Sequence, residues 1–151
     1  MSRTIVLAGI VASAVLLAGS LAHAGTSDTG ASSASGPFIG SWGAKLSYSQ
    51  AYTLGDARMY GRFRLTLRRN GTYTMSNPLD GATSGRLAAL AGKRLRFSQD
   101  TGCMAGGFER PKGGVYRWSI RDGKLMLRLV NEGPCSGRTQ TLTYPTAWKR
   151  R

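Results

Sequence analysis

The stretch RFRLTLRRNGTYTM, from Arg62 to Met75, decides the fold class. Its first seven residues alternate between charged or polar and apolar side chains, which is the period of a half-buried β-strand. An Asn-Gly pair, typical of tight turns, follows, and a second alternating run begins at Thr72. The stretch therefore predicts an antiparallel hairpin with one apolar face and one basic face.

The length of the turn decides which side chains of this hairpin share a face. A two-residue loop would pair Leu67 with a threonine and put Tyr73 on the arginine face. A three-residue loop pairs Leu67 with Tyr73 and Leu65 with Met75, and only this register brings the apolar residues together. We therefore expect a type I turn with Gly71 in the left-handed conformation.

A second hairpin is predicted from VYRWSIRDGKLMLRLV, residues 115–130. Here a two-residue Asp-Gly turn of type I′ puts six large side chains on one face. The expected pairs are Tyr116–Leu129, Trp118–Leu127 and Ile120–Leu125. Trp118 should then lie in the core and matter more for stability than Trp148, which we expect to be partly exposed in the tail WKRR.

Short alternating runs, separated by Gly, Asp, Asn and Pro, continue along the chain, and only RLAALAG (86–92) suggests a helical turn. We predict an all-β fold, an eight-stranded antiparallel up-and-down barrel with no long helix after the N-terminal signal segment. Closing the barrel removes exposed strand edges. The predicted strands are Ile39–Ser47, Tyr60–Arg68, Thr72–Ser76, Arg86–Leu90, Arg94–Ser98, Val115–Ile120, Lys124–Val130 and Arg138–Tyr144.

The first 24 residues have the pattern of a secretory signal peptide. Arg3 precedes an apolar run, and Ala22-His23-Ala24 supplies the small residues at which signal peptidase cleaves. A membrane anchor is the alternative, but the run is short for a span and no basic cluster follows it. We predict secretion (extracellular or periplasmic) with cleavage near Ala24, a flexible lead over 25–36, and one domain over 37–151 with no membrane span.

The exported chain would be strongly basic and would lack histidine. Cleavage removes Arg3 and His23, which leaves 20 of the 21 Lys and Arg residues against all 7 Asp and Glu residues. Without histidine, Ser-His and Cys-His nucleophiles and histidine-bound zinc are excluded. Because the acidic residues are scattered as well, we predict that the protein is not an enzyme and needs no metal or cofactor.

Two cysteines, Cys103 and Cys135, stand in the glycine-containing segments DTGCMAGG and EGPCSG. In a secreted chain such a pair is typically a disulfide. We predict one disulfide between them, with two free thiols as the alternative.

The chain resembles the lipocalin-like, or calycin, family of small barrels. The likeness rests on Gly40-Ser41-Trp42 at the first strand and on Arg138 of PCSGRTQTL near the last, while the family's middle Thr-Asp-Tyr motif has no match. In that family the tryptophan lies at the closed barrel end and a late arginine packs across it. The resemblance therefore implies that Trp42 and Arg138 form this closing pair.

The first functional hypothesis is that the barrel binds a small apolar or amphipathic ligand. Barrels of this size either hold one small ligand or are filled by their own side chains. The alternative is therefore a packed core. The predicted ligand-binding residues are Phe63, Leu65, Tyr73, Met75, Tyr116, Trp118 and Leu127.

The second hypothesis is an interaction module that uses its basic outer face. A strongly cationic surface attracts polyanions such as cell-envelope polymers, or a protein partner. The alternative is that the positive charge only keeps the protein soluble. Specific nucleic-acid binding is not expected, because no stacking motif is evident. The residues predicted to face an anion are Arg62, Arg64, Arg68, Arg117 and Arg128. A cyclase-type small barrel and an inhibitor of a secreted enzyme remain further alternatives.

Overall fold

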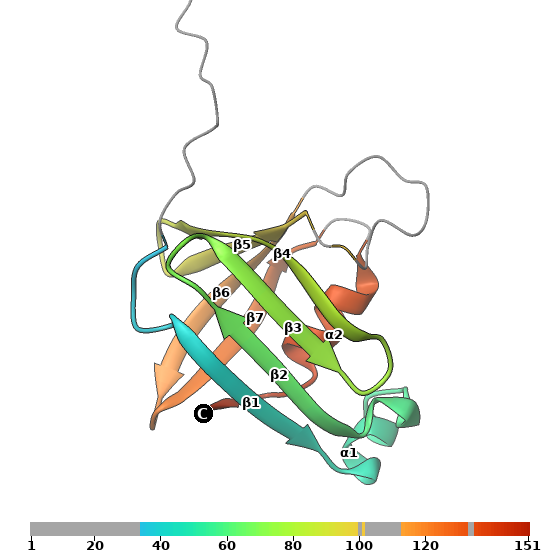
Figure 1. The fold of residues 1–151 in the computed structure, drawn as a ribbon. Coiled ribbons are helices and arrows are strands. Elements are labelled where there is room, and N and C mark those ends of the chain that lie inside the picture. The colour runs from blue at the N-terminus through green and yellow to red at the C-terminus, as the bar shows by residue number, and fades with distance from the viewer. Residues whose placement is uncertain (1–33, 100, 102–112, 133–134) are drawn as a thin grey trace, which may run out of the picture.

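The computed structural model describes residues 34–151 except 100, 102–112 and 133–134. Over this part the chain forms a closed barrel of eight strands in which every neighbouring pair is antiparallel. Consecutive strands lie side by side around the barrel (Figure 1). The predicted all-β, up-and-down barrel is confirmed. The expected signal peptide and most of the expected lead lie outside the described residues.

The elements are β1 (Gly40–Leu46), α1 (Tyr48–Thr53), η1 (Ala57–Met59), β2 (Gly61–Leu67), β3 (Thr72–Asn77), β4 (Gly81–Leu90), β5 (Arg94–Ser98), β6 (Gly114–Arg121), β7 (Lys124–Asn131), α2 (Ser136–Thr143) and β8 (Trp148–Arg150). Short turns join β2 to β3, β3 to β4, β4 to β5 and β6 to β7, and helical segments lie between β1 and β2 and before β8. In Figure 1 the helices lie toward one end of the barrel, and the hairpin turns that follow β2 and β6 lie toward the other.

The register predicted for the first hairpin is confirmed. Leu65 lies opposite Met75 and Leu67 opposite Tyr73. The Gly71 amide donates to the Arg68 carbonyl at 3.2 Å, and Gly71 has φ +71°. Glycine adopts this left-handed conformation without steric cost, so the turn residue and the apolar pattern select the same register.

The second hairpin also has the predicted register, with Tyr116, Trp118 and Ile120 opposite their expected partners. Asp122 and Gly123 have φ values of +50° and +67°, as a type I′ turn requires. One inward prediction is wrong, because Leu129 is 44% exposed. It lies beyond the two residues of β7 that pair with β8.

The eighth predicted strand is wrong, because residues 136–143 form the helix α2. Thr141 and Thr143 donate their hydroxyl protons to the carbonyls of Gly137 and Thr139 at 2.8 and 2.7 Å. The helix buries Arg138 together with Thr141 and Leu142, which are three and four residues further on. This spacing is that of one helix face, so tertiary burial overrides the β preference of threonine.

The strand that closes the barrel is instead β8, which pairs with both β1 and β7. Its first residue, Trp148, is fully buried, so the expectation of a partly exposed tail is wrong. The indole packs edge-on against Phe63 with ring centroids 6.4 Å apart, and its N–H donates to the Leu142 carbonyl at 3.3 Å. Trp118, expected in the core, is only partly buried.

The segment before β1 packs on the barrel in contact with Trp118. Phe38 is 2% exposed, its ring lies 5.1 Å from that of Trp118, and its carbonyl accepts the Trp42 N–H at 2.8 Å. Ala34 is also buried, so the packed part of the chain begins slightly before the predicted boundary at Pro37.

Candidate functional site

The predicted ligand-binding residues lie inside the barrel, where they contact other core side chains. Of the seven, all except Trp118 are at most 5% exposed. The ring of Phe97 lies 4.9 Å from that of Tyr73 and 5.4 Å from that of Tyr116, edge-on in both cases. This packing favours a filled interior over a hollow one.

The interior keeps one unsatisfied polar atom among the described residues, the hydroxyl of Tyr73. A buried hydroxyl without a partner destabilises the fold. The aromatic ring compensates through its apolar contact area.

The arginine that stacks on Trp42 is Arg150, not Arg138. The Arg150 guanidinium carbon lies 5.1 Å from the centroid of the indole ring, and a guanidinium nitrogen donates to the Ile39 carbonyl at 2.7 Å. Such a cation–π contact stabilises the junction of β1 and β8. Within the part of the chain that the structure describes, the contact between Trp42 and Arg138 that the resemblance implied is therefore absent, and Trp42 stacks with Arg150.

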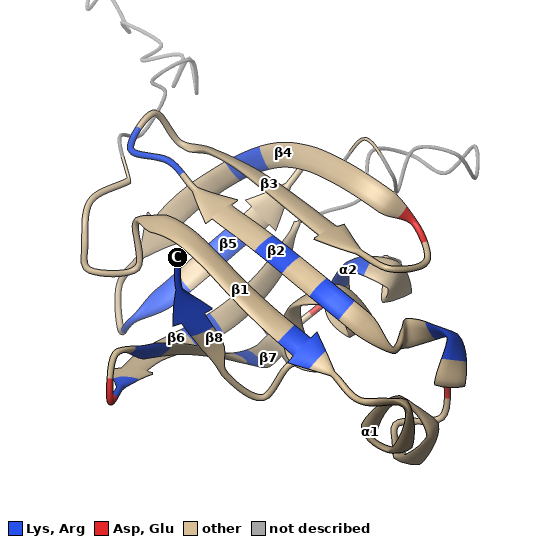
Figure 2. Ribbon diagram, turned by 60° about the horizontal axis from the view of Figure 1, so that its bottom comes forward, with Lys and Arg blue, Asp and Glu red and all other residues tan. Residues whose placement is uncertain are grey.

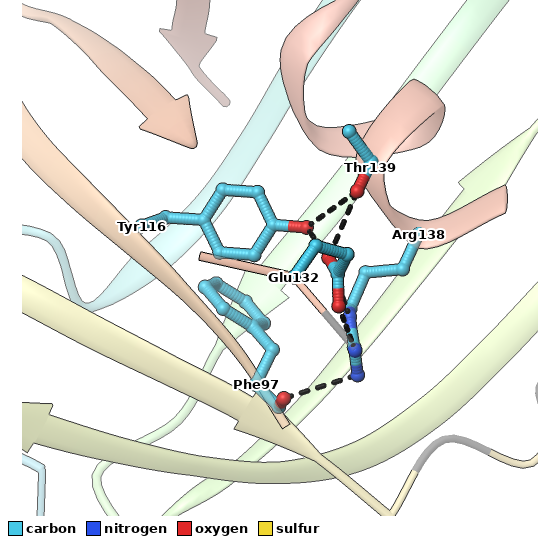
Figure 3. Close-up of polar contacts among 5 residues, drawn as sticks. All are labelled: Phe97, Tyr116, Glu132, Arg138 and Thr139. Atoms are coloured by element: carbon cyan, nitrogen blue, oxygen red, sulfur yellow. Dashed lines mark hydrogen bonds and ion pairs between the residues drawn. The ribbon is translucent and has the colours of Figure 1, made fainter. Parts of the chain in front are cut away.

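Arg138 instead belongs to a buried polar cluster beneath α2 (Figure 3). Its guanidinium forms an ion pair with Glu132 and donates to the Phe97 carbonyl at 3.0 Å. The Glu132 carboxylate also accepts hydrogen bonds from Tyr116 and, at 2.9 Å, from Thr139. The cluster ties β5 and β6 to α2, and these contacts satisfy charges that would otherwise be costly to bury.

Tyr116 gives this cluster a measurable pH dependence. Burial first, and then the hydrogen bond to Glu132, raise the pKa of Tyr116 above its ordinary value of 10.0. Above about pH 10, Tyr116 loses its phenolic proton in the unfolded chain but keeps it in the folded chain. The resulting stabilisation is therefore complete below about pH 10 and is lost as the pH rises further.

We expect the stability advantage of the parent over Tyr116→Phe to shrink by up to about 1.4 kcal/mol for each pH unit above about 10. Chemical denaturation of both proteins from about pH 8 upward measures this difference, and other alkaline effects cancel between them. A difference that is constant across this range would contradict the raised pKa.

The outer surface carries five cationic side chains around one shallow depression. This depression has a volume of about 510 Å³ and involves β1, β2 and β8 and the residue before β8. We call these residues the basic cluster: Lys45, Arg62, Arg64, Lys149 and Arg151. Figure 2 shows the basic bands of β1 and β2 side by side, with β8 next to β1.

Strand register places like charges of the basic cluster next to each other. Lys45 lies directly opposite Arg62, and Arg64 and Lys149 lie on either side of Gly43. A Cβ atom on Gly43 would lie 2.9 Å from the Arg151 side chain, so the glycine lets Arg151 lie flat against β1. Facing like charges destabilise a sheet, so the arrangement is electrostatically costly.

No acidic residue lines this depression. Among the residues that the structure describes, none of the five side chains of the basic cluster makes a hydrogen bond or an ion pair. All five residues are exposed, so their charges are free to meet an external anion.

The five arginines predicted to face an anion are all exposed, but they do not form one wall. Arg62 and Arg64 belong to the basic cluster, and Arg68 donates to the Thr74 hydroxyl at 3.3 Å. Arg117 and Arg128 face each other as predicted, on β6 and β7. Since β2 and β6 are four strands apart in either direction around the ring of eight, the two groups lie on opposite sides.

A second basic group therefore exists on β5, β6 and β7. Arg117 lies opposite Arg94 on one side and Arg128 on the other. We call these three the arginine row. Its members are exposed, and Arg94 donates to the Ala91 carbonyl at 2.8 Å.

Sequence reasoning missed Lys45, Lys149 and Arg151 as partners of Arg62 and Arg64. For Lys45 the alternation of GSWGAKL was a usable signal, because it puts Lys45 on the face opposite to Trp42. For the other two, the position of β8 had to be known first.

Cys135 lies at the start of α2 and is 5% exposed, whereas Cys103 lies outside the described residues. The disulfide between them stays a prediction.

Within the described ranges, no helix has the length and apolar character needed to cross a membrane. Comparisons of the chain with protein-family models, curated proteins and solved structures gave no match.

Proposed function

We propose that this protein binds an anionic polymer through the basic cluster and does not catalyse a reaction. One observation carries the proposal: five cationic side chains surround a single depression, and the described residues offer them no acidic partner. Grouping like charges without compensation costs stability, which an anion spanning several of them would recover. Export, which the first 24 residues predict, would expose the cluster to polymers outside the cell.

A ligand inside the barrel is supported less well. The side chains predicted to bind it contact one another through edge-on ring pairs, so an occupant would have to displace them. The lipocalin-like resemblance concerns the barrel and its closing tryptophan, and it remains a proposal about ancestry. The side chains of the basic cluster, by contrast, are exposed on the outer surface, where a ligand can reach them.

The test compares two variants that lose the same charge at different places. In the first, all five residues of the basic cluster are replaced by Gln. In the second, Gln replaces the arginine row together with Arg96 and Arg121, two further exposed residues on β5 and β6.

Retention on a polyphosphate matrix is measured as a function of salt. Each lost contact lowers the magnitude of the slope of log affinity against log salt concentration by about one unit. The slope of the first variant should therefore be smaller in magnitude than that of the parent by up to about five units. The second should stay close to the parent. Equal losses in both variants would mean that net charge alone is responsible, and the proposed site would be wrong.

A further inference from the structure

Two exposed tyrosines stand next to the basic cluster. Tyr48 is 62% and Tyr60 56% exposed, and their rings meet edge-on with centroids 5.9 Å apart. Exposed apolar side chains that touch one another form a continuous patch, and such patches, unlike single exposed residues, can mark a binding surface. We call these two residues the tyrosine pair.

The backbone holds the tyrosine pair close to the cationic side chains. Tyr60 lies two residues before Arg62, which limits the distance between their Cα atoms to about 7 Å. Tyr48 lies three residues after Lys45, which is the cross-strand partner of Arg62. Tyr48 is also the first residue of α1, whose start is fixed by a capping box between Ser47 and Gln50.

Hydroxyl groups continue the same outer face beyond the cations. The Ser41 hydroxyl lies 3.3 Å from that of Thr66, and Thr66 lies opposite Thr74 on β3. From Tyr60 to Thr66 the chain advances six residues, or about 20 Å. One strip therefore carries aromatic rings, then positive charges, then hydroxyls.

We infer that the anionic polymer is a linear acidic polysaccharide, and this inference rests on the proposed function. Sugar carboxylates can form ion pairs with guanidinium and ammonium groups. Sugar hydroxyls can exchange hydrogen bonds with the hydroxyls of serine and threonine. The C–H groups on the face of a sugar ring are weakly positive, and the face of a tyrosine ring is negative, so the two surfaces attract. The strip is long enough to contact several consecutive sugar units.

Other polyanions use only part of this surface. Polyphosphate has no ring and would gain from the cations alone. Single-stranded nucleic acid can stack bases on exposed aromatic rings, but on this strip the two tyrosines are edge-on to each other and do not form parallel platforms for successive bases.

The experiment measures the affinity of the parent and of two double variants for three probes: polygalacturonate, inorganic polyphosphate and oligo-dT. Tyr48→Ala with Tyr60→Ala removes the rings, and Tyr48→Phe with Tyr60→Phe keeps them. Both positions are exposed, so neither variant should disturb the core. We expect the Ala variant to bind polygalacturonate about three- to tenfold more weakly, on the scale of one or two aromatic contacts. The Phe variant should bind it nearly as well as the parent, and polyphosphate binding should be unchanged in both.

Each contrary result has a distinct meaning. If the Ala variant binds polygalacturonate as tightly as the parent, the polysaccharide inference is wrong while the basic cluster can still bind polyanions. If the Ala substitutions weaken only oligo-dT, the partner is single-stranded nucleic acid and the inference is overturned. If the parent binds none of the probes at moderate salt, the proposed function itself fails.

Discussion

Replacing Trp148 by alanine is expected to lower the free energy of unfolding by about 3–5 kcal/mol. The indole is fully buried between the barrel and α2, in contact with Phe63, and its N–H is bonded to the Leu142 carbonyl. Truncation leaves a cavity and removes that hydrogen bond. It also weakens β8, which has only two paired residues on each side to close the barrel.

The matched control is Trp118→Ala. Trp118 lies on β6 and is only partly buried, so its loss exposes less new apolar surface and should cost less. Urea denaturation of the parent and of both variants gives the two differences. A larger loss for Trp118→Ala than for Trp148→Ala would mean that β8 does not close the barrel as described.

Both hairpins were predictable from the sequence because their determinants are local. Asn70-Gly71 and Asp122-Gly123 specify turn types, and the apolar residues on either side then permit one register. All of this information lies within two short stretches of the chain, residues 62–75 and 115–130. The fold class followed from repeating this reasoning along the chain.

The helix α2 was not predictable in the same way. RTQTLTY alternates β-branched and other residues as a strand does, and its mean apolar character is low. Its buried face is formed by Arg138 and Thr141 as well as Leu142. A polar side chain becomes a core residue only because Glu132 and the Phe97 carbonyl are there to receive it, and sequence periodicity does not report such partners.

The basic cluster shows the same limit at longer range. Arg62 and Arg64 were found from strand alternation, but Lys149 lies beside them only because β8 pairs with β1 across more than a hundred residues of sequence. Assigning 138–144 as the last strand left Lys149 and Arg151 in an apparent tail. Errors in the closing strand of a barrel therefore also become errors about its surface.

Replacing Arg138 by methionine is expected to destabilise the protein by about 3–5 kcal/mol. The guanidinium is wholly buried, and the side chain of its partner Glu132 is only 11% exposed. Methionine preserves much of the volume but leaves the carboxylate without this cation. The Phe97 carbonyl also loses the donor that lies 3.0 Å away. Burying a charge without its counter-charge is among the costliest changes a core can undergo.

The double variant Arg138→Met with Glu132→Gln separates charge from packing. If the uncompensated carboxylate causes most of the loss, removing its charge should restore part of the stability, although Gln accepts the Tyr116 and Thr139 hydrogen bonds less strongly. The double variant should then be more stable than Arg138→Met alone, which urea denaturation at neutral pH can measure. The single variant Glu132→Gln completes the cycle. If the loss in the double variant equals the sum of the losses in Arg138→Met and Glu132→Gln, the two residues act independently. The cluster would then hold α2 through shape and hydrogen bonds and not through its ion pair.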